Sequence, residues 1–285
     1  MNRLTLNANA KINLGLDVIG RLPNGYHEVK MIMQSVGICD ELTFEKQSSG
    51  ITVTTDSGEL PTDENNLIYK AAKLLLDSCE RKEGVRIHLT KRIPIAAGMA
   101  GGSTDAAATL QAVNQLFDLG KTTEELMELG VKIGADVPYC ILGGTALAEG
   151  IGERLTALPP MPDCYLLVAK PGINVSTKYV YTTLDAAPIL SHPDIDGMVN
   201  AIYAGDLTGI TQRLGNVLEA VTITAHPIII DIKEKFLELG SDGVLMSGSG
   251  PTVFGIFSDP TAAEKAYESM KQSSLAGQVF LTTPV

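Results

Sequence analysis

A glycine-rich run between a predicted strand and a predicted helix constrains this chain more than any other feature. The run, residues 94–108, has the sequence PIAAGMAGGSTDAAA. Residues 85–93 before it alternate like a strand, and residues 106–116 after it have helical spacing, with a helix start expected within 103–105. A helix N-terminus leaves unpaired backbone N–H groups, and glycine lets an anion approach them. This order favours a phosphate-binding turn over a merely structural one.

The spacing of the glycines excludes two common nucleotide-binding turns. The chain contains no string of Gly, four residues, Gly-Lys and then Ser or Thr, so it has no P-loop. A dinucleotide fingerprint is excluded because the glycines are wrongly spaced and the preceding strand ends in Pro94.

Composition limits the class of partner. The chain has 285 residues, which predicts about two domains, and a net charge of −11, which makes nucleic acid an improbable partner. An acidic protein that binds phosphate must concentrate positive charge locally, and Lys11, Lys91 and Arg92 are candidates. No signal peptide and no apolar run of about 20 residues is found, so no membrane partner is expected.

The four cysteines predict packing residues rather than a metal or disulfide framework. Cys39, Cys79, Cys140 and Cys164 are scattered and show no metal-ligand spacing. Such cysteines are typical of a reducing compartment, so a cytoplasmic location is expected.

The first half of the chain is predicted to contain strands followed by helices. Alternating residues predict strands at 4–8, 12–19, 29–36, 41–46 and 51–55, and Pro23-Asn24-Gly25 predicts a turn. Apolar spacing predicts helices at 66–78 and 122–130. The second of these begins with a capping-box pattern, Thr122 and Glu125, and is expected to stop at Gly130.

Three prolines within residues 159–162 predict the domain boundary, which gives domains 1–160 and 161–285. Beyond it, strands are expected at 164–169, 243–246, 252–256 and near 279, with a helix at 261–270. This order predicts an α+β half with helices on one face of an antiparallel sheet.

Several separated motifs together resemble the GHMP kinases, the small-molecule kinases of galactose, homoserine, mevalonate and phosphomevalonate. The strings are AKINLGL at 10–16, NGYH at 24–27, GGSTDAA at 101–107, GADVP at 134–138 and MSGSGPT at 246–252. They resemble most the branch that phosphorylates the diphosphocytidyl derivative of methylerythritol in the non-mevalonate isoprenoid pathway. The resemblance implies an α+β, two-domain GHMP kinase fold, with an N-terminal domain like ribosomal protein S5 domain 2 and a C-terminal ferredoxin-like α/β plait. It also implies the use of ATP and Mg²⁺.

The glycine-rich run departs from the family pattern at two positions. Ala100 replaces a glycine, which matters only if this position requires a positive φ. Thr104 replaces a serine and keeps the hydroxyl. Neither change predicts a dead enzyme.

For catalysis, the resemblance implies roles for Asp136 and Lys11. Asp136 would accept the proton of the substrate alcohol, and Lys11 would orient that aspartate and stabilise charge on the transferring group. The residues alone leave other interpretations open. Asp136 precedes Val137-Pro138 and would suit the cap of a short helix, and Lys11 in a plain strand would be exposed to solvent.

The resemblance also implies the ATP site. Its predicted residues are Pro94, Ala96, Ala97, Gly98, Met99, Ala100, Gly101, Gly102, Ser103 and Thr104 for the phosphates, with Asn66 lining the adenine pocket and Lys91 beside the adenine or the phosphates. Ser103 or Thr104 is the candidate Mg²⁺ ligand. Asn66 would equally suit a helix N-cap, and Lys91 a solvated strand end.

The acceptor site follows from the same resemblance. Tyr26 and Tyr181 would sandwich a cytosine, His27 would bind its edge and Asn13 would bind near the methylerythritol hydroxyls. Thr177 and the turn glycines Gly248 and Gly250 complete the predicted set. Taken alone, Tyr26 and His27 are a turn tyrosine and a surface histidine, and the second glycine turn is an ordinary hairpin.

Three functions therefore compete. The first is the kinase of the diphosphocytidyl substrate, a small-molecule enzyme expected to be a monomer or weak homodimer. The second is another GHMP kinase, for homoserine or mevalonate, although such an acceptor has no base to stack on tyrosine. The third is a non-catalytic nucleotide-binding protein, which the presence of both Lys11 and Asp136 disfavours.

Overall fold

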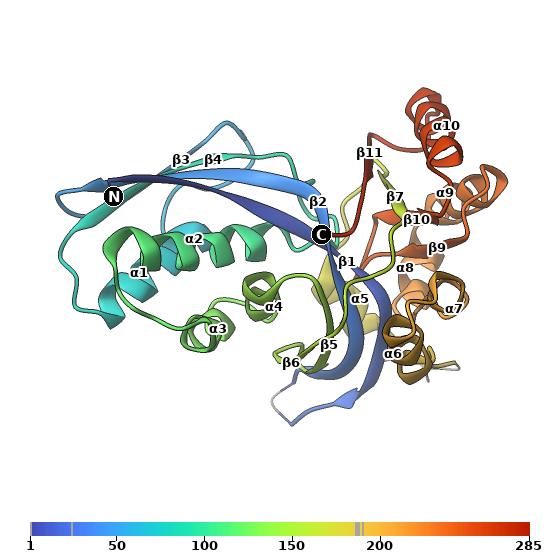
Figure 1. Cartoon of the computed structure of the whole chain (residues 1–285), viewed down its shortest axis with the longest axis horizontal. Helices are drawn as coiled ribbons and strands as arrows, with labels where there is room; N and C mark the ends of the chain where they lie inside the picture. Colours follow the sequence, from blue (N-terminus) through green and yellow to red (C-terminus); the bar gives the residue numbers. More distant parts are fainter. Residues whose placement is uncertain (1, 24, 186–188, 190) are drawn as a thin grey trace. The chain divides into compact units, whose positions relative to one another are not determined.

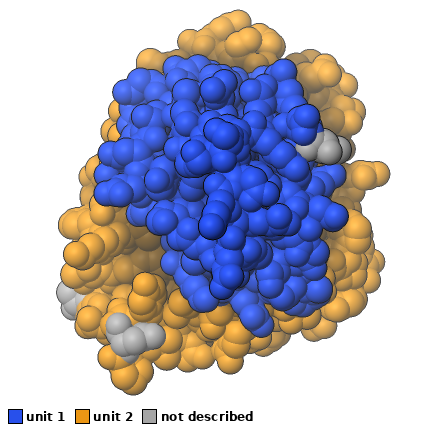
Figure 2. Space-filling view, turned by 90° about the vertical axis from the view of Figure 1, so that its left-hand side faces the viewer, with its two compact units in different colours: residues 1–10, 38–93, 100–143 blue, residues 11–37, 94–99, 144–285 orange. Residues whose placement is uncertain are grey.

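The computed structural model describes residues 2–23, 25–185, 189 and 191–285, and the chain divides into two compact units. Unit 1 consists of Met1–Ala10, Ile38–Ile93 and Ala100–Gly143, and unit 2 of Lys11–Gly37, Pro94–Met99 and Gly144–Val285 (Figure 2). The chain therefore passes repeatedly between the units. The domain boundary at 160–161 stays a prediction, and residue 24 of the predicted turn lies outside the described residues.

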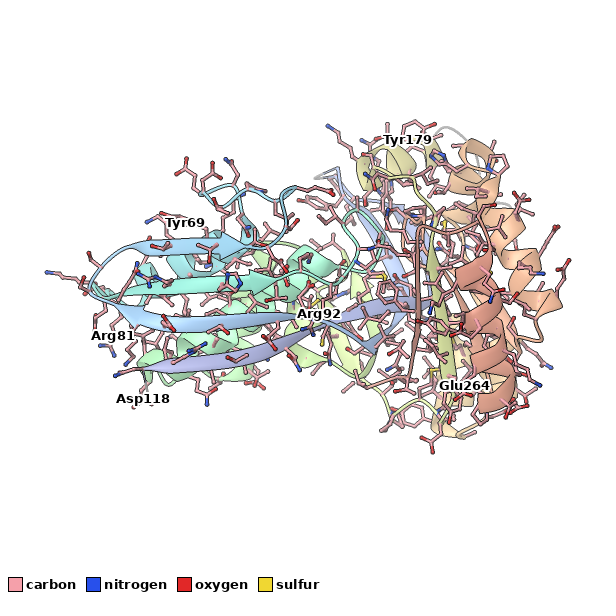
Figure 3. All side chains as sticks on the ribbon, turned by 90° about the horizontal axis from the view of Figure 1, so that it is seen from above. Tyr69, Arg81, Arg92, Asp118, Tyr179 and Glu264 are labelled. Atoms are coloured by element: carbon pink, nitrogen blue, oxygen red, sulfur yellow. The ribbon has the colours of Figure 1, made fainter. Side chains whose placement is uncertain are left out.

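Unit 1 is a sheet with helices on one face (Figure 1). Its strands are parts of β1 (Arg3–Arg21) and β2 (His27–Gln47), with β3 (Ile51–Thr55) and β4 (Gly84–Thr90), in the order β3-β4-β2-β1. Its helices are α1 (Leu67–Ser78), α2 (Gly101–Phe117), α3 (Thr123–Val131) and α4 (Val137–Leu142). Figure 3 shows the strands side by side. The core is the set of apolar side chains between strands and helices, so α2, which follows the glycine-rich run, is anchored along its length.

Unit 2 contains the remaining parts of β1 and β2 and a separate antiparallel sheet. β5 (Thr145–Gly150), β6 (Arg154–Ala157) and β8 (Gly215–Asn216) extend the first sheet. β7 (Tyr165–Lys170), β9 (Gly243–Met246), β10 (Val253–Phe257) and β11 (Gln278–Thr282) form the second, in the order β11-β7-β10-β9. The helices are α5 (Thr177–Leu184), α6 (Ile195–Tyr203), α7 (Leu207–Thr211), α8 (Glu219–Ala225), α9 (Ile228–Glu238) and α10 (Pro260–Gln272). Since α9 and α10 pack on the antiparallel sheet, the predicted α+β arrangement is confirmed.

Four predicted strands are in fact two long ones. Segments 4–8 and 12–19 are one strand, β1, and segments 29–36 and 41–46 are one strand, β2. The alternation of apolar and polar residues breaks because the neighbours of each strand change along its length. In β2, residues 29–34 pair with β5, whereas residues 41–47 pair with β4.

The helix ends differ slightly from the prediction. α2 begins at Gly101, before the predicted 103–105, because Ala100 adopts the N-cap position and its carbonyl accepts from the Thr104 N–H. In α3 the capping box between Thr122 and Glu125 is confirmed, but the helix continues past Gly130 to Val131. Of the described helices, none has the length and apolar character that a bilayer span requires.

The cysteines behave as packing residues. Cys39, Cys79, Cys140 and Cys164 are all free thiols. Burial raises the pKa of the Cys164 thiol to about 12, which keeps it protonated and unreactive.

Candidate active site

The glycine-rich loop between β4 and α2 takes a strained, tightly packed path. Its backbone has positive φ at Ala96 (52°), Gly98 (72°) and Ala100 (56°). Gly98 faces a second turn within unit 2, because a Cβ built on it would lie 2.3 Å from the Ser247 carbonyl oxygen. The Ser247 hydroxyl donates to the Gly98 carbonyl at 3.0 Å. Only glycine fits at position 98, as the predicted phosphate loop requires.

The N-terminus of α2 has backbone donors with no side-chain cap. Ala100 at the N-cap offers no side-chain oxygen, so the first N–H groups of this 17-residue helix are not capped. The two hydroxyls of the first turn differ. Thr104 is 3% exposed and donates to the Asn9 carbonyl at 2.7 Å, whereas Ser103 is partly exposed. Ser103 is therefore the more available hydroxyl for phosphate or metal.

Ala100→Gly should stabilise the protein, because a non-glycine residue in the left-handed region is strained. Relief of that strain outweighs the greater unfolded-state freedom of glycine, and we expect about 0.5–1 kcal/mol more unfolding free energy. Urea unfolding followed by circular dichroism measures it. The control Ala112→Gly, inside α2, should lose at least about 1 kcal/mol. A loss at position 100 as well would contradict the strain argument.

Asp136 lies at the N-cap position of α4, but its side chain makes no hydrogen bond to the helix N–H groups. The cap interpretation is therefore wrong for its carboxylate. The preceding turn lies beside the start of α2, since a Cβ built on Gly134 would be 3.8 Å from the Ser103 Oγ. Asp136 is a partly exposed residue of unit 1.

Lys11 is buried in unit 2, at 5% exposure, so the solvent-exposed interpretation is wrong. Its Nζ donates to the Asn13 Oδ1 at 2.7 Å, and its backbone N–H donates to the Met99 carbonyl in the glycine-rich loop at 3.2 Å. Asn13 is fully buried. Residues 10–18 of β1 are buried on both faces of the strand, so the alternation of residues along it does not predict which side chains are exposed. The result is a fixed positive charge beside the loop.

The second glycine turn, 247–250, is held by residues that the sequence did not indicate. Asn216 donates both amide hydrogens to the carbonyls of Met246 and Gly248, each at 2.8 Å. Gly248 and Gly250 have φ of 57° and 83°, a region that favours glycine at both positions. An asparagine at the end of a two-residue strand gives no sequence signal of this role.

The same turn contacts α5. Thr177 and Ser249 share a hydroxyl–hydroxyl hydrogen bond of 2.9 Å, and the Thr222 hydroxyl donates to the Ser249 carbonyl at 3.1 Å. Thr177 therefore lies at the turn, and its role toward an acceptor stays a prediction.

His27 and Tyr181 lie together in unit 2, with ring centroids 4.9 Å apart. His27 Nε2 is 2.7 Å from Asp185 Oδ1, and this hydrogen bond, with Arg21 contributing, holds the Asp185 pKa below its usual value. A carboxylate only accepts, so the His27 Nε2 carries the proton of this hydrogen bond. Asp185 was missed by the sequence analysis. Tyr26, the residue before His27 in the chain, is 57% exposed.

The two residues predicted near the adenine both have structural roles. Asn66 caps α1, accepting from the Ile68 N–H at 2.9 Å, so its N-cap interpretation is confirmed. Lys91 is not a solvated strand end, because its Nζ is ion-paired with Asp40 and Asp105 and its side chain is 8% exposed. Of the three candidate cations, Arg92 is the exposed one (Figure 3).

Asp105→Asn should remove a pH-dependent loss of stability. Burial raises the Asp105 pKa to about 8, with the Lys91 ammonium opposing and the Asp40 carboxylate adding to the shift. Between the usual value of 3.8 and about 8, the folded protein holds a proton that the unfolded chain releases. The wild-type unfolding free energy therefore falls as the pH rises through this window.

Asparagine is uncharged throughout, so the stability of Asp105→Asn relative to the wild type should increase from acid to mildly alkaline pH. Urea unfolding of both proteins across this range measures the difference. A difference that stays constant with pH would contradict the assigned protonation.

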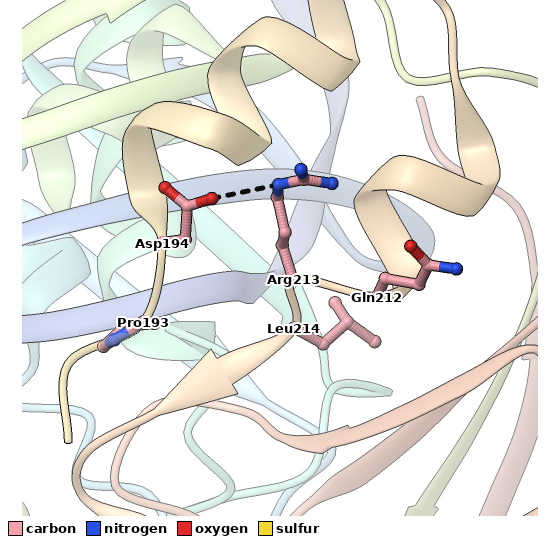
Figure 4. A pocket seen from close by; sticks show the side chains of 5 residues that line it. All are labelled: Pro193, Asp194, Gln212, Arg213 and Leu214. Carbon is pink, nitrogen blue, oxygen red and sulfur yellow. Dashed lines mark hydrogen bonds and ion pairs between the residues drawn. The ribbon is translucent and has the colours of Figure 1, made fainter.

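A cavity of about 380 Å³ lies elsewhere in unit 2, lined by Pro193, Asp194, Gln212, Arg213 and Leu214 (Figure 4). The Arg213 Nε is 3.0 Å from the Asp194 Oδ2, so the one basic group that lines it is already paired. The lining includes no residue of the predicted site.

Comparison with known proteins gives the family. Residues 66–144 match the GHMP kinases N terminal domain, and residues 198–275 match GHMP kinases C terminal. A 4-diphosphocytidyl-2-C-methyl-D-erythritol kinase of Lachnospira eligens is 52% identical over 99% of this chain and 98% of its own. The crystal structure of a 4-(cytidine 5′-diphospho)-2C-methyl-D-erythritol kinase has a TM-score of 0.83 and 34% identity, covering 99% of both chains.

A homoserine kinase from Cytophaga hutchinsonii, 22% identical over 99% of this chain and 94% of its own, has a TM-score of 0.79 and shares the fold. These matches confirm the predicted two-domain GHMP kinase fold and an ATP-using kinase. By its full-length likeness to such relatives, the chain belongs to the GHMP kinases and, within them, to the family of the 4-diphosphocytidyl-2-C-methyl-D-erythritol kinases.

Proposed function

We propose that this chain transfers the γ-phosphoryl group of ATP to the 2-hydroxyl of 4-diphosphocytidyl-2-C-methyl-D-erythritol. The products are ADP and the 2-phosphate, in the non-mevalonate route to isoprenoid precursors. The observation that carries the proposal is the uncapped N-terminus of α2 at the end of a loop where Gly98 is sterically required. The names and full-length similarity of the relatives support the choice of acceptor.

The phosphates of ATP would bind the loop and the first turn of α2, where backbone N–H groups and the helix dipole favour an anion. Mg²⁺ would supply neutralisation of the β- and γ-phosphate charge. Among the described residues, no cluster of three or more His, Cys, Asp or Glu side chains is arranged to hold a metal. Ser103 would be the protein ligand of this ion, because Thr104 is buried and bonded to Asn9.

Asp136 would accept the proton of the acceptor hydroxyl as its oxygen forms the new bond to the γ-phosphorus and the bond to the β-phosphate oxygen breaks. Its position suits this role because Asp136 is partly exposed and follows Gly134, which lies beside Ser103 at the start of α2. Lys11 would orient Asp136 and stabilise charge on the transferring group. A buried lysine held by Asn13 keeps one position, which favours electrostatic stabilisation without reorganisation.

The acceptor's cytosine would stack between Tyr26 and Tyr181, with His27 at its edge. The exposure of Tyr26 and the proximity of the His27 and Tyr181 rings support this arrangement. Asn13 would bind near the methylerythritol hydroxyls, with Thr177, Gly248 and Gly250 near the same substrate. A second glycine turn packed on the loop fits that placement.

Tyr26→Ala should raise the KM for the acceptor with a smaller effect on kcat. Stacking on an aromatic ring is worth about 1–3 kcal/mol and acts in the ground and transition states alike, so the KM should rise about 5-fold or more. Steady-state kinetics at saturating ATP measure it. Tyr203→Ala, equally exposed on α6, is the matched control. An unchanged KM would remove Tyr26 from the site.

We further propose a cytoplasmic enzyme that acts as a monomer or weak homodimer, with neither nucleic acid nor membrane as a partner. The four free thiols fit a reducing compartment, and the net charge of −11 disfavours a polyanionic partner.

The experiment that tests the function is an ADP-release assay with ATP, Mg²⁺ and the diphosphocytidyl substrate, run beside mevalonate, homoserine and galactose. We expect ADP release with the cytidine substrate alone. Turnover with another alcohol instead would keep the kinase and discard the acceptor. ATP binding without turnover of any acceptor would favour the non-catalytic alternative.

A further inference from the structure

Three buried ionisable side chains of unit 1 meet where the chain enters and leaves the glycine-rich loop. The Lys91 Nζ lies 2.5 Å from the Asp40 Oδ2 and 2.9 Å from the Asp105 Oδ2. The side chains of Lys91, Asp40 and Asp105 are exposed by only 8%, 0% and 4%. Lys91 precedes the loop, Asp105 follows it in α2, and Asp40 belongs to β2.

Asp40 also holds the backbone that leads into the loop. Its Oδ1 accepts the N–H groups of Arg92 at 2.5 Å and Ile93 at 2.8 Å. Both oxygens of Asp40 are thus used, one by the Lys91 side chain and one by the two residues before Pro94. A single buried carboxylate therefore fixes the entry of the loop.

The start of α2 packs on the same ammonium group. A Cβ built on Gly101 would lie 2.9 Å from the Lys91 Nζ and 3.1 Å from the Ile93 Cγ2. Gly101, the first residue of α2, therefore lies against the Lys91 ammonium group. This packing does not depend on the ion pairs, and it too places the start of α2 beside Lys91.

We infer that Asp40, Lys91 and Asp105 form a loop clasp that fixes the two ends of the glycine-rich loop, so that Lys91 positions the phosphate site and is not a phosphate ligand. The inference rests on the proposed function in one respect, that this loop binds phosphate. With its ends fixed, the loop keeps its N–H donors aimed before the nucleotide arrives. Moving Lys91 to a phosphate would leave Asp40 charged and buried without a counter-ion, which is strongly unfavourable.

Hydrogen exchange in the nucleotide-free enzyme tests the clasp. Lys91→Met should make the amides of residues 94–104 exchange about tenfold faster, because a foldon without its ion pairs opens more often. Lys73→Met is the matched control, since Lys73 forms only an exposed pair with Asp77 on α1. A side chain that merely binds phosphate would leave this exchange unchanged, and that result would overturn the inference.

Kinetics separate positioning from a general structural role. We expect Lys91→Met to raise the KM for ATP about tenfold, with the KM of the acceptor changed less than about twofold. If Lys91→Met keeps the wild-type KM values and only lowers the fraction of active enzyme, Lys91 is a purely structural residue and the inference is overturned. If Lys91→Met does not fold, Asp105→Ala can be used, because it removes the contact between Asp105 and Lys91 and should likewise raise the exchange rate and the KM for ATP. Asp105→Asn keeps an oxygen for Lys91, so its exchange rate and KM for ATP should return toward the wild-type values.

Failure of the inference and of the proposed function are distinguishable. The exchange measurement needs no substrate, whereas the function fails only if the wild type does not release ADP with the diphosphocytidyl acceptor.

Discussion

Asp136→Ala should lower turnover by about 10²–10⁴-fold, the usual contribution of a general base. Nucleotide affinity should stay within a few-fold, because Asp136 is outside the glycine-rich loop and its side chain makes no cap to α4. Without the carboxylate, the acceptor hydroxyl must lose its proton to water as the phosphoryl group arrives. The measurement is kcat by ADP release, with ADP affinity by calorimetry.

Asp136→Asn separates charge from shape, since the amide has the same outline and cannot accept the proton. We expect it to be nearly as slow as the alanine variant. Asp231→Ala, exposed on α9, is the control and should keep wild-type kcat. A kcat of Asp136→Asn above about a tenth of the wild-type value would contradict the assignment of the base.

Among substitutions in the loop that add no polar or charged group, Gly98→Ala should be the most damaging. The added Cβ would lie 2.3 Å from the Ser247 carbonyl oxygen and 3.2 Å from that of Gly250, at a φ of 72°. These contacts are with backbone, so no side chain can turn away to relieve them. Either the loop or the 247–250 turn must move, and a misplacement of about 1 Å costs on the order of 10²-fold in kcat/KM.

Kinetics with ATP varied, together with urea unfolding, measure both consequences of Gly98→Ala. Gly172→Ala is the matched control within unit 2, since a Cβ there meets no atom within 4 Å. Full activity and full stability of Gly98→Ala would show that the loop and the turn are not packed as described.

Local sequence patterns predicted α1, α2, α3 and α10 because the causes of these helices are local, and the order of the elements predicted the antiparallel sheet. The capping box of α3 and the N-cap of α1 depend on residues within one turn, and both are as expected. The predicted strands failed at β1 and β2, where the break in alternation came from a change of neighbours. In β2, that change replaces β5 by β4 as the partner. A strand that pairs with segments far away in the sequence need not show one hydrophobic period along its length, so its full extent cannot be predicted from that period.

The candidate site divides in the same way. The glycine-rich loop was predictable because strand, glycines and helix follow one another directly. The side chains that hold it were not, because Asp40 is 51 residues from Lys91 and Asn216 is 32 from Gly248. The ligand roles of Lys11, Asp136, Tyr26 and the other site residues stay predictions until the experiments above are done.

The sequence by itself predicted where a phosphate would bind, since Gly98, Gly101 and Gly102 lie between a predicted strand and a predicted helix. Only the tertiary structure decided what the charged residues nearby can do. Lys11 is buried because both faces of its strand are covered, and Lys91 is buried because two carboxylates from β2 and α2 face it. Burial and charge pairing depend on segments brought together by folding, so they decide which lysine positions the loop and which stands as a fixed charge beside it.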